Sequence, residues 1–412
     1  MKFNKWTVAL AAIGVVSLAS AARADEATKM NTVQTALSDT TISGYVDASA
    51  NWRPGTDANT ITGASGARVP GNSFAPNDGF ALDGLDLALN KPEDESPWAA
   101  GYRLEIRGIS TPGNIAGNVI PQAYVTLRTP VGNGIDWKVG IWDTIVGYES
   151  SSDPLNPNYT RSYGYTIEPT THTGILATYK INDMVTVQAG IADGSNVAGG
   201  PLGENGVSAI ESQKAYMGDL QFTAPDSAGF MKGATLTVAA IDAAGVGTAD
   251  PGSTSFYVGA TIPTPVSALK VGACFDYLDI HNGSVTGNPA NDSIWNIALY
   301  GSYQATEKLS LNVRAEYLDT SAIGGSDGAL FGGFTTPGTL AYELSDDHTQ
   351  NVQAIEELTF TAQYNLWVNV ISRVEFRWDH VEHGDAFGAN SATGAPDKGN
   401  DFLLALNLIY QF

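Results

Sequence analysis

The sequence has only one cysteine, Cys274, so no disulfide can form within the chain. Its stability must come from other interactions, even in an oxidising compartment where disulfides persist. Charged residues make up only 16% of the chain, whereas an average soluble domain has about 25%. Basic residues are especially scarce, with 21 Lys and Arg against 43 Asp and Glu. This acidic balance argues against nucleic acid as a partner.

Long apolar runs are missing beyond the first residues, and no later segment approaches the roughly 20 apolar residues of a membrane-spanning helix. The early run at 6–18 follows Lys2 and Lys5 and precedes a small-x-small site at 22–24. These features are typical of an export signal, so we predict that 1–24 is a signal peptide, cleaved after its last residue. Its removal would leave 18 basic and 43 acidic residues, a formal net charge of −25. Such acidity either keeps exposed loops soluble or biases a pore toward cations.

Apolar and polar residues alternate repeatedly with a period of two. In 98–107, one face is apolar and the other carries Arg103, Glu105 and Arg107. The same pattern recurs in 309–317 and 368–379, and it suits strands with one face toward lipid and the other toward water. A membrane protein without membrane helices has to be a closed barrel, because only closure satisfies every backbone group in hydrocarbon.

Sixteen strands are predicted from this alternation. They lie near 42–52, 80–90, 98–109, 121–129, 135–142, 172–181, 184–192, 213–223, 233–242, 254–262, 267–278, 294–304, 308–319, 352–364, 367–379 and 400–412. Short and long connections alternate between them, as do the periplasmic turns and extracellular loops of bacterial outer-membrane barrels. We therefore predict an all-β fold, a closed antiparallel transmembrane barrel over 41–412 in the bacterial outer membrane. Residues 25–40 would form a short periplasmic segment.

The last predicted strand alternates strictly and finishes in an aromatic residue. Its apolar face comprises Phe402, Leu404, Leu406, Leu408, Tyr410 and Phe412. This ending resembles the C-terminal signature of outer-membrane proteins, which the barrel-insertion machinery reads. The expected partners are therefore that machinery, through Phe412, and the lipid of the outer membrane.

Charged side chains fall on the inward face of the predicted strands. They are Arg103, Glu105, Arg107, Arg128, Lys138, Arg314, Glu316, Arg373, Glu375 and Arg377. Charge within a membrane is costly unless it faces water or a partner, and a barrel of about sixteen strands is wide enough for an aqueous channel. We predict that these residues line a pore for the passive diffusion of small hydrophilic solutes and ions. Alternatively, the paired Arg and Glu residues only brace the wall.

The connection 143–171 is among the longest and is rich in Pro and Asn. It holds the charged residues Glu149, Asp153, Arg161 and Glu168. In general porins the third external loop folds into the lumen and sets the constriction, and by position this segment resembles that loop. Its acids would then face basic wall residues across a narrow eyelet, whose transverse field would orient polar solutes. The alternative is a surface loop tied down by its prolines.

Three motifs in this region carry a resemblance to a known family. They are Val-Gly-Ile-Trp-Asp-Thr-Ile-Val-Gly-Tyr-Glu at 139–149, Asn-Pro-Asn-Tyr-Thr-Arg-Ser at 156–162 and Glu-Pro-Thr-Thr-His-Thr-Gly at 168–174. The chain resembles the OmpL-like β-barrel porin family, in which a comparable succession occurs at this point. The resemblance would cover most of the mature chain and implies a bacterial outer-membrane porin without catalytic residues. The wider likeness to porins implies a possible homotrimer.

Enzyme-like patterns are weak. Residues 324–328 match a nucleophile-elbow string but lie in a Gly-rich loop rather than a strand-to-helix turn. His380-Val-Glu-His383 lacks the His-Glu-x-x-His spacing of a zinc helix. We therefore predict no enzymatic activity, no metal and no cofactor.

The alternatives to a passive diffusion channel are a channel selective for sugars or anions, an outer-membrane hydrolase and a purely structural barrel. Aromatics that could line a sugar path are Trp142, Tyr148, Tyr159, Tyr163 and Tyr165.

Overall fold

The computed structural model describes residues 39–55, 78–111, 114–116, 120–193, 214–244, 252–280, 292–319, 354–382, 387 and 398–412. The strands are β1 (Thr41–Trp52), β2 (Gly79–Lys91), β3 (Ala100–Thr111), β4 (Asn114–Ala116), β5 (Gln122–Thr129), β6 (Ile135–Asp143), β7 (Thr171–Lys180), β8 (Val185–Ala192), β9 (Ala215–Thr223), β10 (Thr235–Ala243), β11 (Ser253–Pro263), β12 (Leu269–Ile280), β13 (Asp292–Gln304), β14 (Leu309–Asp319), β15 (Ala354–Trp367), β16 (Val370–Val381) and β17 (Asn400–Gln411). The helices are short: η3 (Asp153–Leu155), α3 (Tyr163–Ile167) and η5 (Asp226–Met231). No helix in these ranges is long and apolar enough to cross a membrane.

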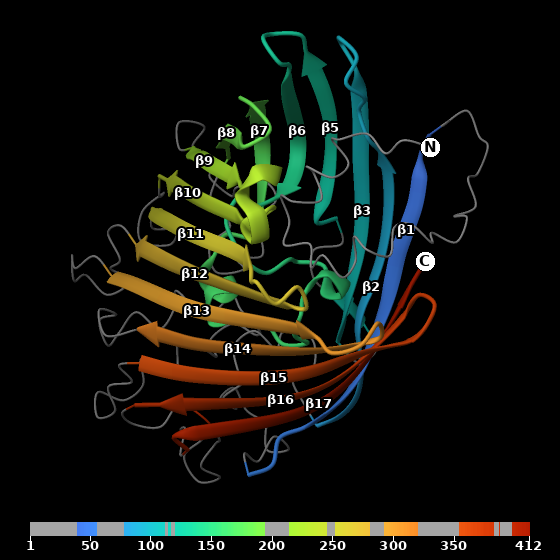
Figure 1. The fold of residues 1–412 in the computed structure, drawn as a ribbon, viewed down its shortest axis with the longest axis vertical. Helices are drawn as coiled ribbons and strands as arrows, with labels where there is room; N and C mark the ends of the chain where they lie inside the picture. The colour runs from blue at the N-terminus through green and yellow to red at the C-terminus, as the bar shows by residue number, and fades with distance from the viewer. Residues whose placement is uncertain are drawn as a thin grey trace.

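The described strands form a closed antiparallel ring (Figure 1). Each strand pairs with its neighbours in sequence, and β1 closes the ring by pairing with β17, for example Ala50 opposite Leu406. The short β4 pairs only with β3, so sixteen of the seventeen described strands make the barrel. Closure leaves no unpaired edge, which hydrocarbon requires. The predicted fold class is confirmed.

The predicted strands match the observed ones closely, and their ends differ by at most three residues. One of the largest differences is at the β15–β16 hairpin, where the sequence analysis placed the turn at 365–366. The structure places it at 368–369, and Asn369 has a φ of 66°. Asparagine tolerates this left-handed conformation, which tight hairpin turns require.

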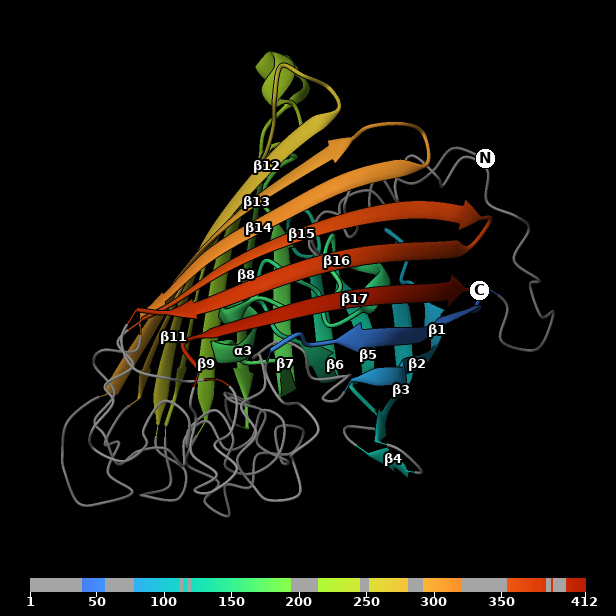
Figure 2. The same ribbon diagram turned by 90° about the horizontal axis from the view of Figure 1, so that it is seen from below.

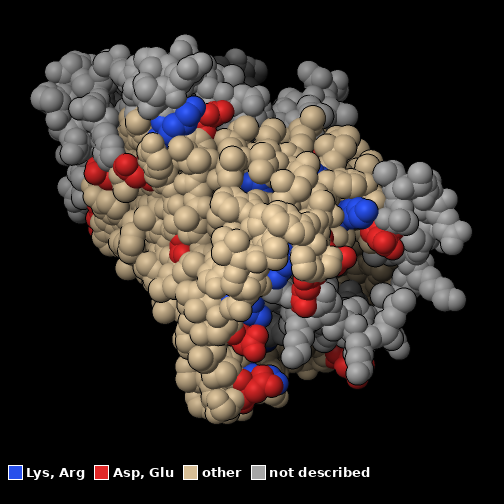
Figure 3. Space-filling view, turned by 90° about the horizontal axis from the view of Figure 1, so that it is seen from above, with Lys and Arg blue, Asp and Glu red and all other residues tan. Residues whose placement is uncertain are grey.

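The alternation of side chains follows the ring. In β17, Phe402, Leu404 and Leu406 are exposed on the outer face, while Leu403 and Ala405 are buried inside. Uncharged residues dominate the described part of the face shown in Figure 3. The apolar outer face and polar inner face are those of a barrel that contacts lipid outside and polar groups within.

The described termini lie at the same end of the barrel (Figure 2). The Phe412 amide donates to the Gly44 carbonyl over 3.0 Å, and the Gly44 amide donates back to the Phe412 carbonyl over 3.0 Å. The shorter connections between strands, such as 130–134, 181–184 and 368–369, lie at this end. We call it the turn end.

Candidate functional site

The connection 144–170 between β6 and β7 lies inside the ring of strands, and we call it the interior loop (Figure 1). Its base is closed by the Thr144 amide, which donates to the Thr170 carbonyl over 3.0 Å. Asn156 fastens its first half, because its side chain accepts from the Ser150 amide over 2.8 Å and donates to the Ser150 carbonyl. Side chains that replace backbone partners in this way fix the shape of a loop.

The second half of the interior loop is held by short polar contacts. The Ser162 hydroxyl caps α3 by accepting from the Tyr165 amide over 2.9 Å. Glu149 accepts from the Ser162 amide over 2.8 Å, and Asp153 pairs with Arg161 over 2.6 Å. The loop therefore has a defined conformation that presents backbone groups to the wall.

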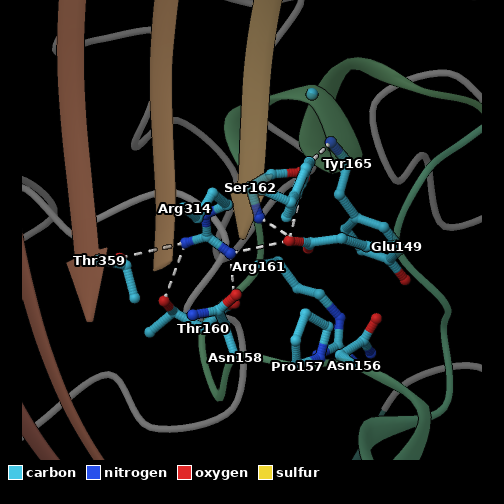
Figure 4. A network of polar contacts seen from close by, with 12 residues as sticks. Glu149, Asn156, Pro157, Asn158, Thr160, Arg161, Ser162, Tyr165, Arg314 and Thr359 are labelled. Atoms are coloured by element: carbon cyan, nitrogen blue, oxygen red, sulfur yellow. Dashed lines mark hydrogen bonds and ion pairs between the residues drawn. The ribbon is translucent and has the colours of Figure 1, made fainter. Parts of the chain in front are cut away.

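Three arginines on β14 and β16 donate to backbone carbonyls of the interior loop. Arg314 on β14 donates to the Thr160 carbonyl over 2.7 Å and contacts Glu149 over 2.8 Å (Figure 4). Arg373 and Arg377 on β16 donate to the carbonyls of Asn156 and Arg161 over 2.6 and 2.7 Å. These charge-assisted bonds satisfy carbonyls that no strand partner reaches.

Carboxylates beside these arginines accept from the loop in turn. Glu375 accepts from the amides of Tyr159 and Thr160 over 2.5 and 2.9 Å. Glu316 accepts from the Tyr163 amide over 3.0 Å, and Asp379 accepts from the Tyr163 hydroxyl over 2.7 Å. The wall from β14 to β16 thus offers donors and acceptors that match the loop backbone.

The opposite side of the interior loop packs on an apolar wall. Trp142 at the end of β6, with Val146 and Tyr148, forms one buried cluster with small residues of β8 to β13, among them Ala192, Ala215, Ala239, Ala243 and Ala298. The Tyr148 ring stacks on Tyr300 with centroids 4.1 Å apart. A Cβ at Gly272 would overlap the Tyr148 hydroxyl, so glycine leaves the room for this ring. The inward alternation of small residues in these strands is the sequence signal for this surface.

Half of the ten residues predicted to line the pore lie beneath the interior loop. Arg314, Glu316, Arg373, Glu375 and Arg377 are all buried there, and each touches the loop directly. Where the sequence analysis placed a gap between loop acids and wall arginines, Glu149 and Arg314 form a direct ion pair. Opposite charges attract strongly in a low-dielectric interior, so they meet rather than face each other across water.

The remaining predicted residues lie on β3, β5 and β6. Arg107 reaches the Ser151 carbonyl of the loop over 3.1 Å, and Glu105 bridges Arg103 and Arg107. Arg128 on β5, also predicted to line the pore, pairs with Asp136 over 2.5 Å near the turn end. Lys138 lies over the Tyr124 ring, 4.7 Å from its centroid. Arg103 and Lys138 keep part of their side chains exposed.

The four predicted loop residues all lie within the barrel. Glu149 contacts Arg314, Asp153 pairs with Arg161, and Glu168 lines a small cavity together with Asp276 on β12. The predicted set omitted other buried acids that the alternation sends inward. Among them are Asp47, Asp83, Asp276, Glu357 and Asp379.

The interior is strongly acidic. Buried carboxylates among the described residues are Asp47, Asp83, Asp86, Glu105, Glu149, Asp153, Glu168, Asp219, Asp276, Glu316, Glu357, Glu375, Asp379 and Asp401. The buried basic residues in the same ranges are Arg53, Arg107, Arg128, Arg161, Arg314, Arg373 and Arg377. Carboxylates are thus twice as numerous. No group of three or more His, Cys, Asp or Glu side chains in the described ranges is arranged to hold a metal ion.

Solved structures share this architecture. The outer membrane channel DcaP of Acinetobacter baumannii superposes with a TM-score of 0.57 at 12% identity, covering 90% of this chain and 97% of that one. OmpF of Salmonella typhi, solved with daunomycin, gives 0.56 at 15% identity over 90% and 97%. An anion-selective porin from Comamonas acidovorans gives 0.55 at 12% identity over 90% and 99%. At these identities the likeness shows the fold alone.

The sequence itself assigns the family. No curated protein matches the chain. Residues 39–412 match the model of the family described as "Putative beta-barrel porin-2, OmpL-like". This match spans the whole barrel and includes the three motifs of the sequence analysis. The chain therefore belongs to this OmpL-like family of β-barrel porins of the bacterial outer membrane.

Proposed function

We propose that the chain is a passive diffusion channel for small hydrophilic solutes and ions, driven by the solute gradient. One observation carries this proposal: a closed ring of strands, apolar outside and polar inside, holds a long loop within it through its own wall residues. A barrel that served only as an anchor would have no need of a lumen lined with so many charges. The family assignment supports the same function.

In this proposal the interior loop is the constriction. It reaches from the apolar wall at Tyr300 to Glu375 and, through Tyr159, to Ser49 on β1. A loop fastened at both sides narrows the lumen at a fixed height and cannot swing freely. Solutes would then pass beside it, where part of Arg103 and Lys138 remains exposed. The buried residues Arg314, Arg373 and Arg377 would shape the passage by holding the loop.

A channel selective for sugars is less well supported. The aromatic residues that could form a sugar path are largely covered: Trp142 and Tyr163 are fully buried, and Tyr148 and Tyr159 are nearly so. Stacking on a sugar requires an exposed ring face. The acidic interior favours cations over anions as the preferred ions.

We also propose that the chain has no enzymatic activity. The string at 324–328 and the residue His383 lie outside the described residues. Within the described ranges, His172 faces Thr144 and is fully buried, away from any exposed surface. The charged side chains that touch the interior loop form ion pairs and hydrogen bonds that hold the loop in place.

Export, insertion and assembly complete the proposal. Residues 1–24 would be removed as a signal peptide, and β17 would be read by the insertion machinery through Phe412. Assembly as a homotrimer is supported by OmpT of Vibrio cholerae, a solved structure of similar fold described in a trimer form.

The test is planar-bilayer recording of the purified, detergent-folded protein. We expect stepwise insertions, each with a current proportional to voltage, because a fixed aqueous lumen behaves as an ohmic resistor. A proteoliposome swelling assay with uncharged sugars of increasing size would give the exclusion limit. Correctly folded protein that produces neither steps nor swelling would contradict the proposal.

A further inference from the structure

The end of the interior loop brings two carboxyl groups together. Glu168 in the loop and Asp276 on β12 line the same small cavity between the loop and the wall, and both residues are almost entirely buried. An ionised carboxylate only accepts hydrogen bonds, so a bond between two carboxyl groups requires a proton on one of them. This pair of acids therefore differs from every ion pair that holds the rest of the loop.

No cation compensates this pair within the described residues. The neighbouring acids each have an arginine: Glu149, Glu316 and Glu357 lie 2.8, 3.2 and 3.1 Å from Arg314, and Asp379 lies 2.8 Å from Arg377. Neither Glu168 nor Asp276 forms an ion pair with a described Lys or Arg. Burying an isolated carboxylate is so costly that the group takes up a proton instead.

The titratable groups around Glu168 are all acidic or neutral. They are Asp276 and Cys274 on β12, Tyr257 on β11, Glu316 on β14 and Glu149 of the loop. The Cys274 thiol lies 3.5 Å from Asp276. Burial, together with the nearby carboxylates of Asp276, Glu149 and Glu316, raises the pKa of Glu168 well above its ordinary range.

We propose that Glu168 and Asp276 share one proton and that this protonated pair positions the end of the interior loop against the barrel wall. Both are positioning residues that act through the loop, so the idea rests on the proposed role of the loop as the constriction. Because the folded state binds the proton more tightly than the unfolded chain, the pair stabilises the loop at low pH. This stabilisation is lost as the pH rises through the raised pKa of Glu168, and the loop end then loosens.

Infrared difference spectroscopy tests the shared proton directly. A protonated carboxyl absorbs at a frequency distinct from an ionised carboxylate, so at neutral pH we expect both Glu168→Gln and Asp276→Asn to lose one protonated band relative to wild type. Glu149→Gln is the matched control, because its carboxylate in the same loop is paired with Arg314 and should leave that band unchanged. Retention of the full band in both Glu168→Gln and Asp276→Asn would overturn the proposal. This readout does not depend on whether the protein conducts.

Current fluctuations in a bilayer test the positioning role. We expect open-channel noise in wild type to grow as the pH rises, because the loop end loosens when the proton is lost. Glu168→Gln keeps a neutral donor for Asp276 at every pH, so its noise should stay low and independent of pH. If Glu168→Gln shows the same pH dependence as wild type, the pair does not position the loop.

Discussion

At the scale of single residues, Arg314 has the most demanding position in the barrel. It is fully buried and contacts three carboxylates, those of Glu149, Glu316 and Glu357. A buried ion network of this kind is stable only while every member keeps its partners. The sequence analysis predicted that Arg314 points inward and lines a pore, but local alternation contains no sign that the interior loop would cover this residue.

Replacement of Arg314 by Met should destabilise the protein strongly. The change leaves three buried carboxylates without their shared cation, which costs about 3–5 kcal/mol when a buried pair is broken. Chemical unfolding followed by tryptophan fluorescence measures the loss. Arg128→Met is the control, since Arg128 pairs with a partly exposed Asp136 near the turn end. If Arg314→Met is no less stable than the control, the network does not hold the loop as described.

At the scale of elements, the interior loop is held by two unlike surfaces. The strands β14 to β16 bind its backbone with charged side chains, and the strands β8 to β13 accept its aromatic residues on small ones. The polar surface fixes the position of the backbone, because each hydrogen bond demands a particular geometry. The apolar surface determines how closely the aromatic side chains of the loop pack on the wall, because close-packed interiors tolerate little added volume.

Gly272→Ala should disturb the fit of the loop on β12. The added Cβ would overlap the Tyr148 hydroxyl and push the ring off its stack with Tyr300. Overpacking of this kind costs about 1–3 kcal/mol, and the displaced loop should alter single-channel conductance. Gly218→Ala on β9 is the matched control, because the atom nearest to its Cβ is 3.4 Å away. Equal conductance and stability in the two variants would show that Tyr148 does not depend on this glycine.

At the scale of the whole molecule, charge decides what the barrel can pass. The chain has a formal net charge of −22, and its buried carboxylates outnumber its buried arginines two to one in the described ranges. The field of such an interior raises the local concentration of cations. Ion pairs cancel only part of this charge, because Arg314 on β14 is shared among three acids and Arg377 on β16 between two.

The zero-current potential across a bilayer in a potassium chloride gradient should therefore report a preference for potassium over chloride. Acidification protonates carboxylates and removes negative charge from the interior, so the preference should weaken as the pH falls toward about 4. High salt screens the same field and should weaken it as well. A potential that favours chloride at neutral pH would contradict the acidic interior as the determinant of selectivity.

The sequence by itself determined the barrel, because alternation with a period of two depends only on neighbours along the chain. Strands such as β17 therefore could be predicted to within a few residues, together with the face on which Leu404 or Leu403 would lie. What lies opposite an inward side chain was decided only by the tertiary structure. Arg314 meets Thr160, and Arg377 meets Arg161, across more than 150 positions of sequence. Local periodicity contains no information about such distant partners, so it could not separate the charges that face the lumen from those that hold the loop.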